Sequence, residues 1–355
     1  MNKFITIGMD LGDKKNFVVV LNEEGKKVVS KFVKNTSKQI DKFFTDYEGK
    51  NIRIIMETGT HSPWISELLK KKNFEVLIVN SNQLPLISKS IKKNDMNDAE
   101  ILARLGRLDP ELLHTIEHRS KEAQVDLVLI KSRNHLVEIR AKLVNHIRGI
   151  LKSYGQSLPS CSTPSFSKKV MFNIPAELKS SIKPILETLD GLTENIKNYD
   201  QQIIKLSEHK YPETKILQQV NGVGPITSLT YALTIETPEK FLKSRSVGAF
   251  LGLTSKVFSS GETNKQLRIS KAGNKYLRRL LISCAQYILG PFGQDCDLRN
   301  HGLKIMSRGG KNAKKKAVVA VARKLAVLLH HLWKTNAIYD PFYNTKKNNK
   351  LKQCS

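Results

Sequence analysis

Apolar residues in the first third of the chain form short runs that alternate with amphipathic stretches. This pattern predicts strands near residues 4–10, 17–21, 27–33, 52–56 and 75–79, and helices near residues 37–47, 63–72 and 95–107. The predicted order is three strands, a helix, a strand, a helix, a strand and a helix. A chain with this order is expected to build an α/β layer structure.

The middle of the chain, from about residue 117 to 210, has a helical pattern with two heptad-like series separated by a Ser/Pro-rich stretch at 157–167. The first series repeats every seven residues, at Leu129, Leu136, Leu143 and Ile150. The second alternates steps of three and four, at Ile182, Ile185, Leu189, Leu192, Ile196, Tyr199, Ile203 and Leu206. Such spacing predicts a coiled coil, formed either as an antiparallel hairpin within one chain or as a contact between two copies.

Four segments follow from these patterns. We predict a ribonuclease-H-like domain at residues 1–115, a helical coiled-coil region at 116–210, a mostly helical domain at 211–343 and a basic tail at 344–355. The fold class is therefore α/β plus α. A chain of 355 residues with 40% hydrophobic residues is long enough to build two or three domains with their own cores.

The third segment carries glycine-rich turns and exposed polar residues. Val220-Asn-Gly-Val-Gly-Pro225 precedes a helix predicted through Ile226 to Leu233, and its Gly-Val-Gly is like the turn of a helix-hairpin-helix module, which binds a DNA phosphate through backbone N–H groups. A simple tight turn is the alternative. Further on, Ser259 and Ser260 precede Gly261 on a predicted loop among cations. A serine in such a place is either a nucleophile or a turn residue.

Charge adds a nucleic-acid partner to this picture. The chain has 59 Lys and Arg against 32 Asp and Glu, a formal net charge of +27. Between Glu262 and Asp340 the only acids are Asp295 and Asp297. A long segment with this excess of positive charge indicates binding to a nucleic-acid phosphate backbone. The alternatives are solvated lysines without a partner and an anionic membrane surface. The predicted nucleic-acid-binding residues are Arg268, Lys271, Lys275, Arg278, Arg279, Lys311, Lys314, Lys315 and Lys316.

Against this positive background, four acids occupy positions that predict a metal site. Asp10 and Glu57 each end an apolar strand, whereas Asp95 and Asp98 lie three residues apart at the start of a helix and so share one face. Carboxylates are the ligands that Mg²⁺ prefers, and two such ions about 4 Å apart can stabilise both oxygens of a phosphoryl displacement. The alternative for Asp95 and Asp98 is a helix cap.

Other features narrow the setting of the protein. No apolar run reaches the roughly 18 residues of a membrane span, and the first residues lack the pattern of a signal peptide, so we expect a cytosolic protein without a membrane partner. The cysteines show no paired spacing for zinc and are expected to be reduced. They are Cys161, Cys284, Cys296 and Cys354.

Several ordered motifs together resemble one family. Asp10, Glu57 and the run Lys-Asn-Asp-Met-Asn-Asp-Ala, then Gly-Val-Gly-Pro, Ser-Ser-Gly and Ile-Ser-Lys-Ala-Gly-Asn-Lys-Tyr-Leu-Arg-Arg, resemble the DEDD insertion-sequence transposases related to Piv invertases, the insertion-sequence family called one-ten. The resemblance extends from Ile5 to about Tyr343. It implies a RuvC-like N-terminal domain, a helical coiled coil and a C-terminal transposase domain.

The resemblance also implies a chemistry. Asp10, Glu57, Asp95 and Asp98 would bind Mg²⁺, and Ser260, with Ser259 as the adjacent alternative, would attack a DNA phosphodiester to form a covalent protein–DNA intermediate. The family acts on donor and target DNA under a noncoding guide (bridge) RNA. A homo-oligomer, a dimer or a tetramer, is expected, in the cytoplasm of a bacterial or archaeal cell and associated with its nucleoid.

Departures from the family pattern affect the serine loop rather than the acids. Thr254-Ser255 replaces a frequent Thr-Pro or Val-Pro, Glu262 stands where a second glycine is common, and Asn94 replaces a threonine. Alternative functions are a RuvC-like nuclease that hydrolyses DNA junctions with the same acids, a DNA invertase without guide RNA, an ATPase suggested by Asp10-Leu-Gly12, and a non-enzymatic nucleic-acid-binding protein. The sequence has no second glycine-rich phosphate hairpin of the kind that such an ATPase needs. A non-enzymatic binding protein would leave the four acids without a function.

Overall fold

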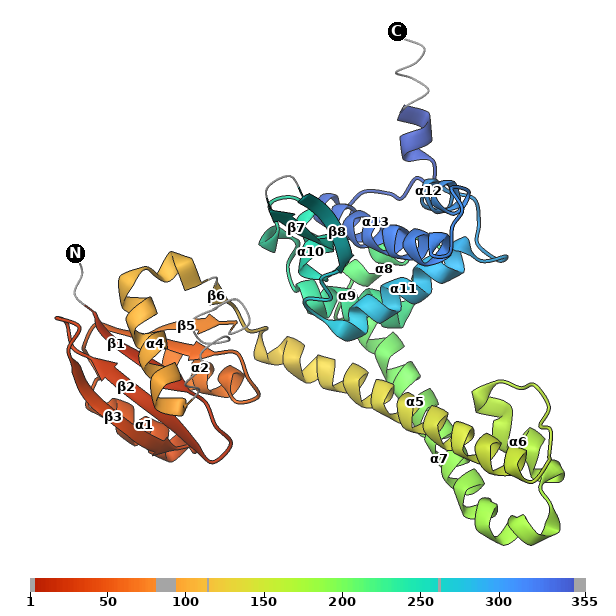
Figure 1. The fold of residues 1–355 in the computed structure, drawn as a ribbon, viewed down its shortest axis with the longest axis horizontal. Helices are drawn as coiled ribbons and strands as arrows, with labels where there is room; N and C mark the ends of the chain where they lie inside the picture. Colours follow the sequence, from red (N-terminus) through yellow and green to blue (C-terminus); the bar gives the residue numbers. More distant parts are fainter. Residues whose placement is uncertain (1–3, 81–93, 114, 261–262, 348–355) are drawn as a thin grey trace. The chain divides into compact units, whose positions relative to one another are not determined.

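The computed structural model describes residues 4–80, 94–113, 115–260 and 263–347 (Figure 1). The chain divides into two units, residues 1–119 and residues 120–355, each with its own hydrophobic core. Gly261, Glu262 and the part of the predicted basic tail from 348 to 355, which includes Cys354, lie outside the described residues.

The first unit is built on one mixed sheet with the strand order β3-β2-β1-β4-β5-β6. The central pairs β1–β4 and β4–β5 are parallel, whereas β1–β2, β2–β3 and β5–β6 are antiparallel. The strands are β1 (Ile5–Asp10), β2 (Lys15–Leu21), β3 (Lys27–Lys34), β4 (Ile52–Glu57), β5 (Glu75–Val79) and β6 (Thr115–Ile116).

Helices cover both faces of this sheet, which is why its central strands are apolar on both sides. Helices α1 (Ser37–Thr45) and α2 (Ser62–Lys70) pack against the face that carries Ile7, Met9 and Val20. Helix α4 (Asp95–Leu108) packs on the opposite face. The predicted order of strands and helices is confirmed, with bounds that differ by two residues or fewer. The short β6 was not predicted because a two-residue exposed strand leaves no alternation to detect.

A glycine inside a strand brings α4 unusually close to the sheet. A Cβ atom added at Gly8 would lie 1.9 Å from the carbonyl oxygen of Ala99 and 2.7 Å from the backbone nitrogen of Ala103. Only a residue without a side chain therefore lets the α4 backbone cross β1 at this point. Gly106 of α4 makes a similar approach to Ile55 of β4. These two glycines fix where the first turn of α4 lies relative to the sheet.

The second unit begins with two long helices, α5 (Lys121–Ser153) and α7 (Ala176–His209), which pack against each other. The contacts between the two helices follow α5 forwards and α7 backwards along the chain. Arg133 pairs with Asp200 at 2.8 Å, and Arg140 Nη1 donates to Thr193 Oγ1 at 3.3 Å. The helices are therefore antiparallel within one chain, as in the intramolecular alternative. The connection contains α6 (Phe166–Val170) and short 3₁₀ turns at 163–165 and 171–173.

The predicted seam of α7 lies in this interface, and that of α5 lies beside it. Every seventh residue of the α7 series is buried: Ile182, Leu189, Ile196 and Ile203. The heptad leucines of α5 are only half-buried, because the fully buried line runs next to them. That line consists of Ala123, Leu127, Ile130, Arg140, Val144, Ile147 and Leu151.

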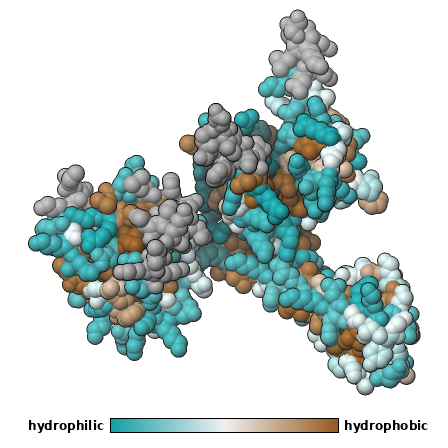
Figure 2. All heavy atoms as spheres, in the orientation of Figure 1, coloured by the Kyte–Doolittle hydropathy of each residue, from teal (hydrophilic) through white to brown (hydrophobic). Residues whose placement is uncertain are grey.

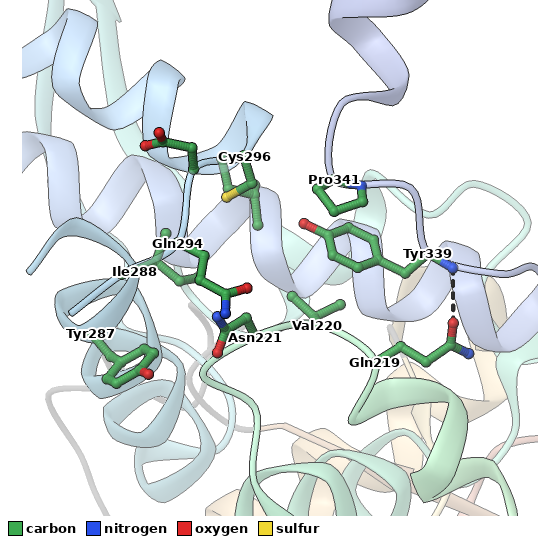
Figure 3. A pocket seen from close by; sticks show the side chains of 12 residues that line it. Gln219, Val220, Asn221, Tyr287, Ile288, Gln294, Cys296, Tyr339 and Pro341 are labelled. Carbon is green, nitrogen blue, oxygen red and sulfur yellow. Dashed lines mark hydrogen bonds between the residues drawn. The ribbon is translucent and has the colours of Figure 1, made fainter.

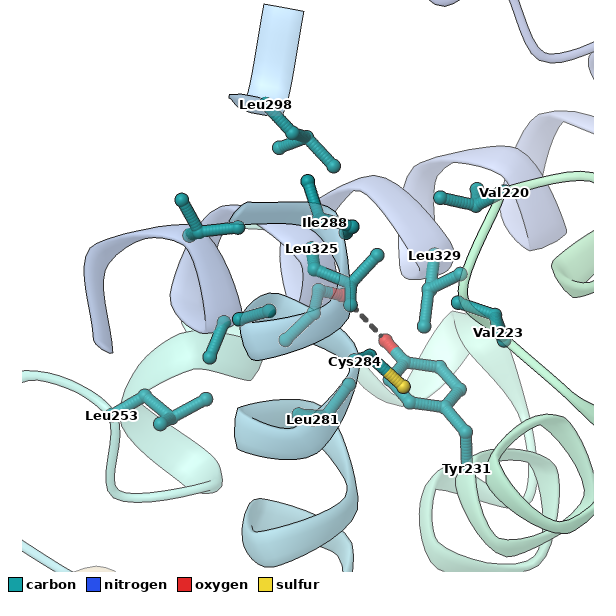
Figure 4. Close-up of a cluster of buried hydrophobic side chains, with 14 of the residues drawn as sticks. Val220, Val223, Tyr231, Leu253, Leu281, Cys284, Ile288, Leu298, Leu325 and Leu329 are labelled. Atoms are coloured by element: carbon teal, nitrogen blue, oxygen red, sulfur yellow. Dashed lines mark hydrogen bonds between the residues drawn. The ribbon is translucent and has the colours of Figure 1, made fainter. Parts of the chain in front are cut away.

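The rest of the second unit is mostly helical and packs around one large core. A two-stranded antiparallel sheet of β7 (Ser255–Ser260) and β8 (Thr263–Ile269) interrupts the helices. At the centre of the core, the buried Tyr231 hydroxyl donates to the Ala326 carbonyl oxygen at 2.7 Å (Figure 4). The helices are α8 (Glu213–Leu217), α9 (Pro225–Ile235), α10 (Ser246–Phe250), α11 (Lys275–Leu289), α12 (Asp297–Met306) and α13 (Ala313–Thr335).

Hydrophilic residues cover much of the visible surface of both units (Figure 2). In the part of the chain that the structure describes, no helix is both long enough and apolar enough to cross a membrane. The described cysteines, Cys161, Cys284 and Cys296, carry free thiols.

Candidate functional site

The strand order places the first two predicted acids side by side. Asp10 is the last residue of β1, and Glu57 is the last residue of β4. The two strands are parallel neighbours, with Met9 opposite Met56 in the register. Because parallel strands end at the same edge of a sheet, both carboxylates lie at one edge, where sites in α/β folds commonly form.

Helix α4 supplies the other two acids from its first turn. Asp98 is 7% exposed, whereas Asp95 is exposed. The cap of this helix is Asn94, whose side chain accepts a hydrogen bond from the Asn97 backbone at 2.7 Å. The interpretation of the two aspartates as the helix cap is therefore wrong, although the helix dipole still favours their negative charge.

The charges of the other three acids act on Asp10. The pKa of Asp10 rises from its ordinary 3.8 to about 6, first because the carboxyl is partly buried and then because of the charges of Asp95, Glu57 and Asp98, in that order. A hydrogen bond from the Leu11 backbone opposes the rise. Negative charges that raise the pKa of a neighbouring carboxyl favour a bound cation or proton.

The donor set suits a hard divalent cation, but its atoms are not yet gathered around one point. All four side chains offer carboxylate oxygens, the ligands that Mg²⁺ takes. Within the described ranges, no group of three or more His, Cys, Asp or Glu side chains has a geometry that could hold a metal ion.

A polar network lies in the loops after β1 and β4. The Trp64 indole N–H donates to His61 Nδ1 at 3.2 Å, which leaves the imidazole proton on Nε2. That nitrogen faces Asp13 Oδ1 at 3.3 Å. The network orients the loop that follows Glu57.

The predicted serine nucleophile lies in the second unit, at the end of a strand rather than on a loop. Ser259 and Ser260 are the last residues of β7, and Ser260 is opposite Thr263 of β8 across the hairpin turn. The loop prediction is wrong because residues 257–260 pair with residues 263–266 in an antiparallel ladder, which has a register shift between Ser255 and Val257. Ser260 nevertheless directly adjoins the hairpin turn.

Comparisons with known proteins agree with the order of these motifs. Residues 7–156 match a family model described as "Transposase", and residues 214–293 match one described as "Transposase IS116/IS110/IS902 family". The chain belongs to this insertion-sequence transposase family. The two matched regions contain the four acids and the serine hairpin.

Relatives in this transposase family are moderately similar. The transposase for insertion sequence element IS1111A of Coxiella burnetii is 30% identical over 67% of this chain, which spans 65% of that protein's length. A probable family 20 transposase of Pseudomonas aeruginosa is 28% identical over 70% of this chain and 74% of its own. A putative transposase of Sinorhizobium fredii, y4pF/y4sB, is 25% identical over 96% of this chain and 86% of its own length.

The basic residues predicted to bind nucleic acid differ in their contacts with the rest of the protein. Lys271, Lys275 and Arg268 are exposed around the start of α11. The second basic group is also exposed, before α13 and in its first turn: Lys311, Lys314, Lys315 and Lys316. These residues present their charges to solvent, where a phosphate backbone can reach them.

Two of the predicted arginines are instead held by the protein. Arg278 Nη1 donates to the carbonyl oxygens of Leu251 at 2.9 Å and Ala272 at 2.6 Å, and burial lowers its pKa. Arg279 pairs with Glu138 of α5 at 2.9 Å and also bonds Asn134. These contacts fix the turn before α11 and tie α11 to α5.

Gly8 matters for the placement of the acids but was not predicted from the sequence. Gly8 allows α4 to approach β1 and thereby brings Asp98 into the surroundings of Asp10. A glycine in the middle of an otherwise apolar strand is the signal that could have revealed it.

Proposed function

We propose that this chain is a Mg²⁺-dependent, RNA-guided, site-specific DNA recombinase that moves an insertion sequence. The observation that carries the proposal is the placement of Asp10 and Glu57 at the ends of two paired parallel strands, in a member of a transposase family. The pKa of Asp10 supports it, because burial first and then the charges of Asp95, Glu57 and Asp98 raise it to about 6. The net charge of +27 supports a nucleic-acid substrate.

Asp10, Glu57, Asp95 and Asp98 are the residues that would hold the metal. When bound, Mg²⁺ would neutralise charge on the phosphoryl oxygens of the DNA. The protein supplies the rigid part of this arrangement through the paired strand ends and the first turn of α4.

Ser260 is the proposed nucleophile. Its Oγ attacks the DNA phosphorus, the new O–P bond forms, and the bond to the departing strand breaks, which leaves that strand with a free hydroxyl. The proton of the serine passes to a carboxylate. The departing strand takes up a proton as its hydroxyl forms. A hydroxyl of another strand then attacks the same phosphorus, the new strand is joined, and the serine O–P bond breaks as the serine takes back a proton, so bond energy is conserved without ATP.

The remaining parts of the proposal concern partners. Donor and target DNA, a noncoding guide RNA and a second or further copies of the chain are expected, because two duplexes must be cut and exchanged. The exposed cations Arg268, Lys271 and Lys275, together with the basic residues around the start of α13, supply contacts to phosphates.

A cleavage assay separates recombination from hydrolysis. The purified chain, with co-purified RNA and Mg²⁺, is incubated with DNA that carries its own element's ends, and strand exchange and free cut strands are measured separately. Ser260→Ala is expected to abolish both, whereas Ser259→Ala, the matched neighbour, retains exchange.

The opposite result identifies the second candidate function. If Ser260→Ala still cuts DNA while Asp98→Asn does not, the four acids activate water, and the chain is a RuvC-like nuclease rather than a serine recombinase. If neither Asp10→Asn nor Asp98→Asn affects strand exchange, the assignment of the metal site is wrong.

A further inference from the structure

A cavity of about 180 Å³ opens in the second unit between three segments that are far apart in the sequence (Figure 3). They are the turn before α9, the end of α11 with the loop that follows it, and the segment after α13. The volume is below the roughly 300–1,000 Å³ of pockets for drug-sized ligands, so the cavity suits one small ring system.

Two side-chain amides converge on this cavity. Figure 3 shows Asn221 and Gln294 pointing toward one another from opposite walls. Both residues line the cavity, one from the turn before α9 and one from the loop after α11. Each amide offers a donor and an acceptor on one edge, the pattern that reads the edge of a nucleobase.

Aromatic residues stand beside the amides. The Tyr287 ring is 44% exposed and packs against Gly222, where an added Cβ would lie 2.8 Å from Tyr287 Cδ1. The glycine has φ +90°, so both its conformation and the space favour the absence of a side chain. Phe292, which precedes the lining residue Gly293, is 82% exposed. Such rings are platforms on which unpaired bases stack.

The walls of the cavity are fixed by contacts within the protein. Arg299 Nη1 donates to the carbonyl oxygens of Ile288 at 2.6 Å and Gly290 at 2.7 Å. Gln219 Oε1 accepts from the Tyr339 backbone N–H at 2.9 Å. The Cys296 thiol accepts from the Arg299 backbone and is buried, which leaves it no part in ligand chemistry. The site is therefore preformed.

We propose that this cavity binds one unstacked nucleobase from a single-stranded segment of nucleic acid. Asn221 and Gln294 read its polar edge, and Tyr287 stacks on its face. The inference rests on the proposed function, which requires strands to separate during exchange. A phosphate does not fit, because the lining contains no Lys or Arg and its one charged side chain, Asp295, is acidic.

Photo-crosslinking tests the contact directly. Full-length protein is irradiated with a 4-thiouridine RNA and, separately, a 4-thiothymidine DNA of equal length, each single-stranded, and the crosslinked peptides are identified by mass spectrometry. Crosslinks to Tyr287 or Tyr339 are expected. A crosslink from RNA alone assigns the base to the guide, and one from DNA alone assigns it to the exchanging strand.

Binding of variants tests the role of the amides. Asn221→Ala combined with Gln294→Ala is expected to weaken fluorescence-anisotropy binding of the crosslinking strand about tenfold, with duplex binding unchanged. The matched control replaces Gln201 and Gln202, exposed amides on α7, by alanine and retains wild-type affinity. An unchanged thermal midpoint confirms that the cavity variant is folded.

Two results overturn the inference while leaving the proposed function intact. One is the absence of crosslinks to the three cavity segments in a protein that still exchanges strands. The other is equal affinity of the cavity variant and wild type for both single strands. Failure of strand exchange with an intact crosslink would instead refute the proposed function alone.

Discussion

At the scale of single residues, Asp10 gives the acidic group a pH dependence that can be measured. Its pKa is about 6 instead of 3.8, so the folded, metal-free protein holds a proton there more tightly than the unfolded chain does. The stabilisation from this group is complete below pH 3.8 and is lost as the pH rises through about 6. In the proposed site Mg²⁺ would compete with the same proton, because it would bind the carboxylate form.

We therefore expect Mg²⁺ to bind more tightly as the pH rises through about 6. Isothermal titration of the full chain with Mg²⁺ across this range checks the prediction, and Asp10→Asn should flatten the pH profile. A wild-type affinity that does not change through this range would contradict the role given to Asp10.

A second prediction concerns the ligand role of Asp10. Asp10→Asn is expected to remove most of the rise in unfolding temperature that Mg²⁺ produces in the wild type, because one charged ligand is lost. Asp13→Asn is the matched control, since the Asp13 side chain is 97% exposed and three residues further on. Equal Mg²⁺ shifts in both variants, measured by thermal unfolding, would exclude Asp10 as a ligand.

The sequence alone predicted the strand-end positions of two of the four acids. Asp10 and Glu57 were predicted at strand ends, and the sheet places them at one edge because β1 and β4 are parallel neighbours. The sequence could not predict which of the basic side chains are free of contacts with the rest of the protein. Arg278 and Arg279 resemble their exposed neighbours in the sequence, yet backbone carbonyls and Glu138 hold them.

At the scale of elements, the position of α4 depends on a missing side chain. Gly8→Val would place a branched side chain where an added Cβ already lies 1.9 Å from the Ala99 carbonyl oxygen. We expect a loss of about 1–3 kcal/mol in the free energy of unfolding, together with weaker Mg²⁺ binding as α4 moves away. Urea unfolding and Mg²⁺ titration measure the two effects.

The control for this change is Gly59→Ala, where an added Cβ meets no atom within 4 Å. Its stability should stay within about 0.5 kcal/mol of wild type. If Gly8→Val is as stable as wild type and binds Mg²⁺ equally well, the close approach of α4 does not form the site.

Strands and helices were predictable wherever one period dominated. The strands of the first unit and the α7 seam follow periods of two and about three and a half residues, and burial follows both. The heptad of α5 predicted a buried line that lies one residue away from the observed one. The half-buried leucines repeat at the same interval as the buried residues beside them. The serine hairpin was missed because glycine and serine are common in loops as well as at strand ends.

At the scale of the whole molecule, charge should dominate binding to nucleic acid. Replacing Lys314, Lys315 and Lys316 by glutamine is expected to lower affinity for DNA of any sequence and to reduce the salt slope by about 2–3, since each phosphate contact contributes about 0.9. Anisotropy titrations at several salt concentrations measure the slope. The control replaces Lys179, Lys197 and Lys205, exposed on α7. Equal slopes for the two triple variants would refute a specific role for the start of α13.

Features assembled from distant segments lay beyond sequence patterns. The cavity between the turn before α9, the end of α11 and the segment after α13 joins residues 219–221 to residues 339–341, and no periodicity links them. The two matched family regions, residues 7–156 and 214–293, were recognisable in the sequence because each contains contiguous motifs.

We infer that the chain joins itself to DNA through Ser260. After incubation with the element's DNA, RNA and Mg²⁺, trypsin should release a nucleotide-bearing peptide that spans Val257 to Lys265. Tandem mass spectrometry is expected to place the phosphate on Ser260, and EDTA or Asp98→Asn should prevent its formation. Attachment at another residue, or recombination without any attached peptide, would contradict the claim.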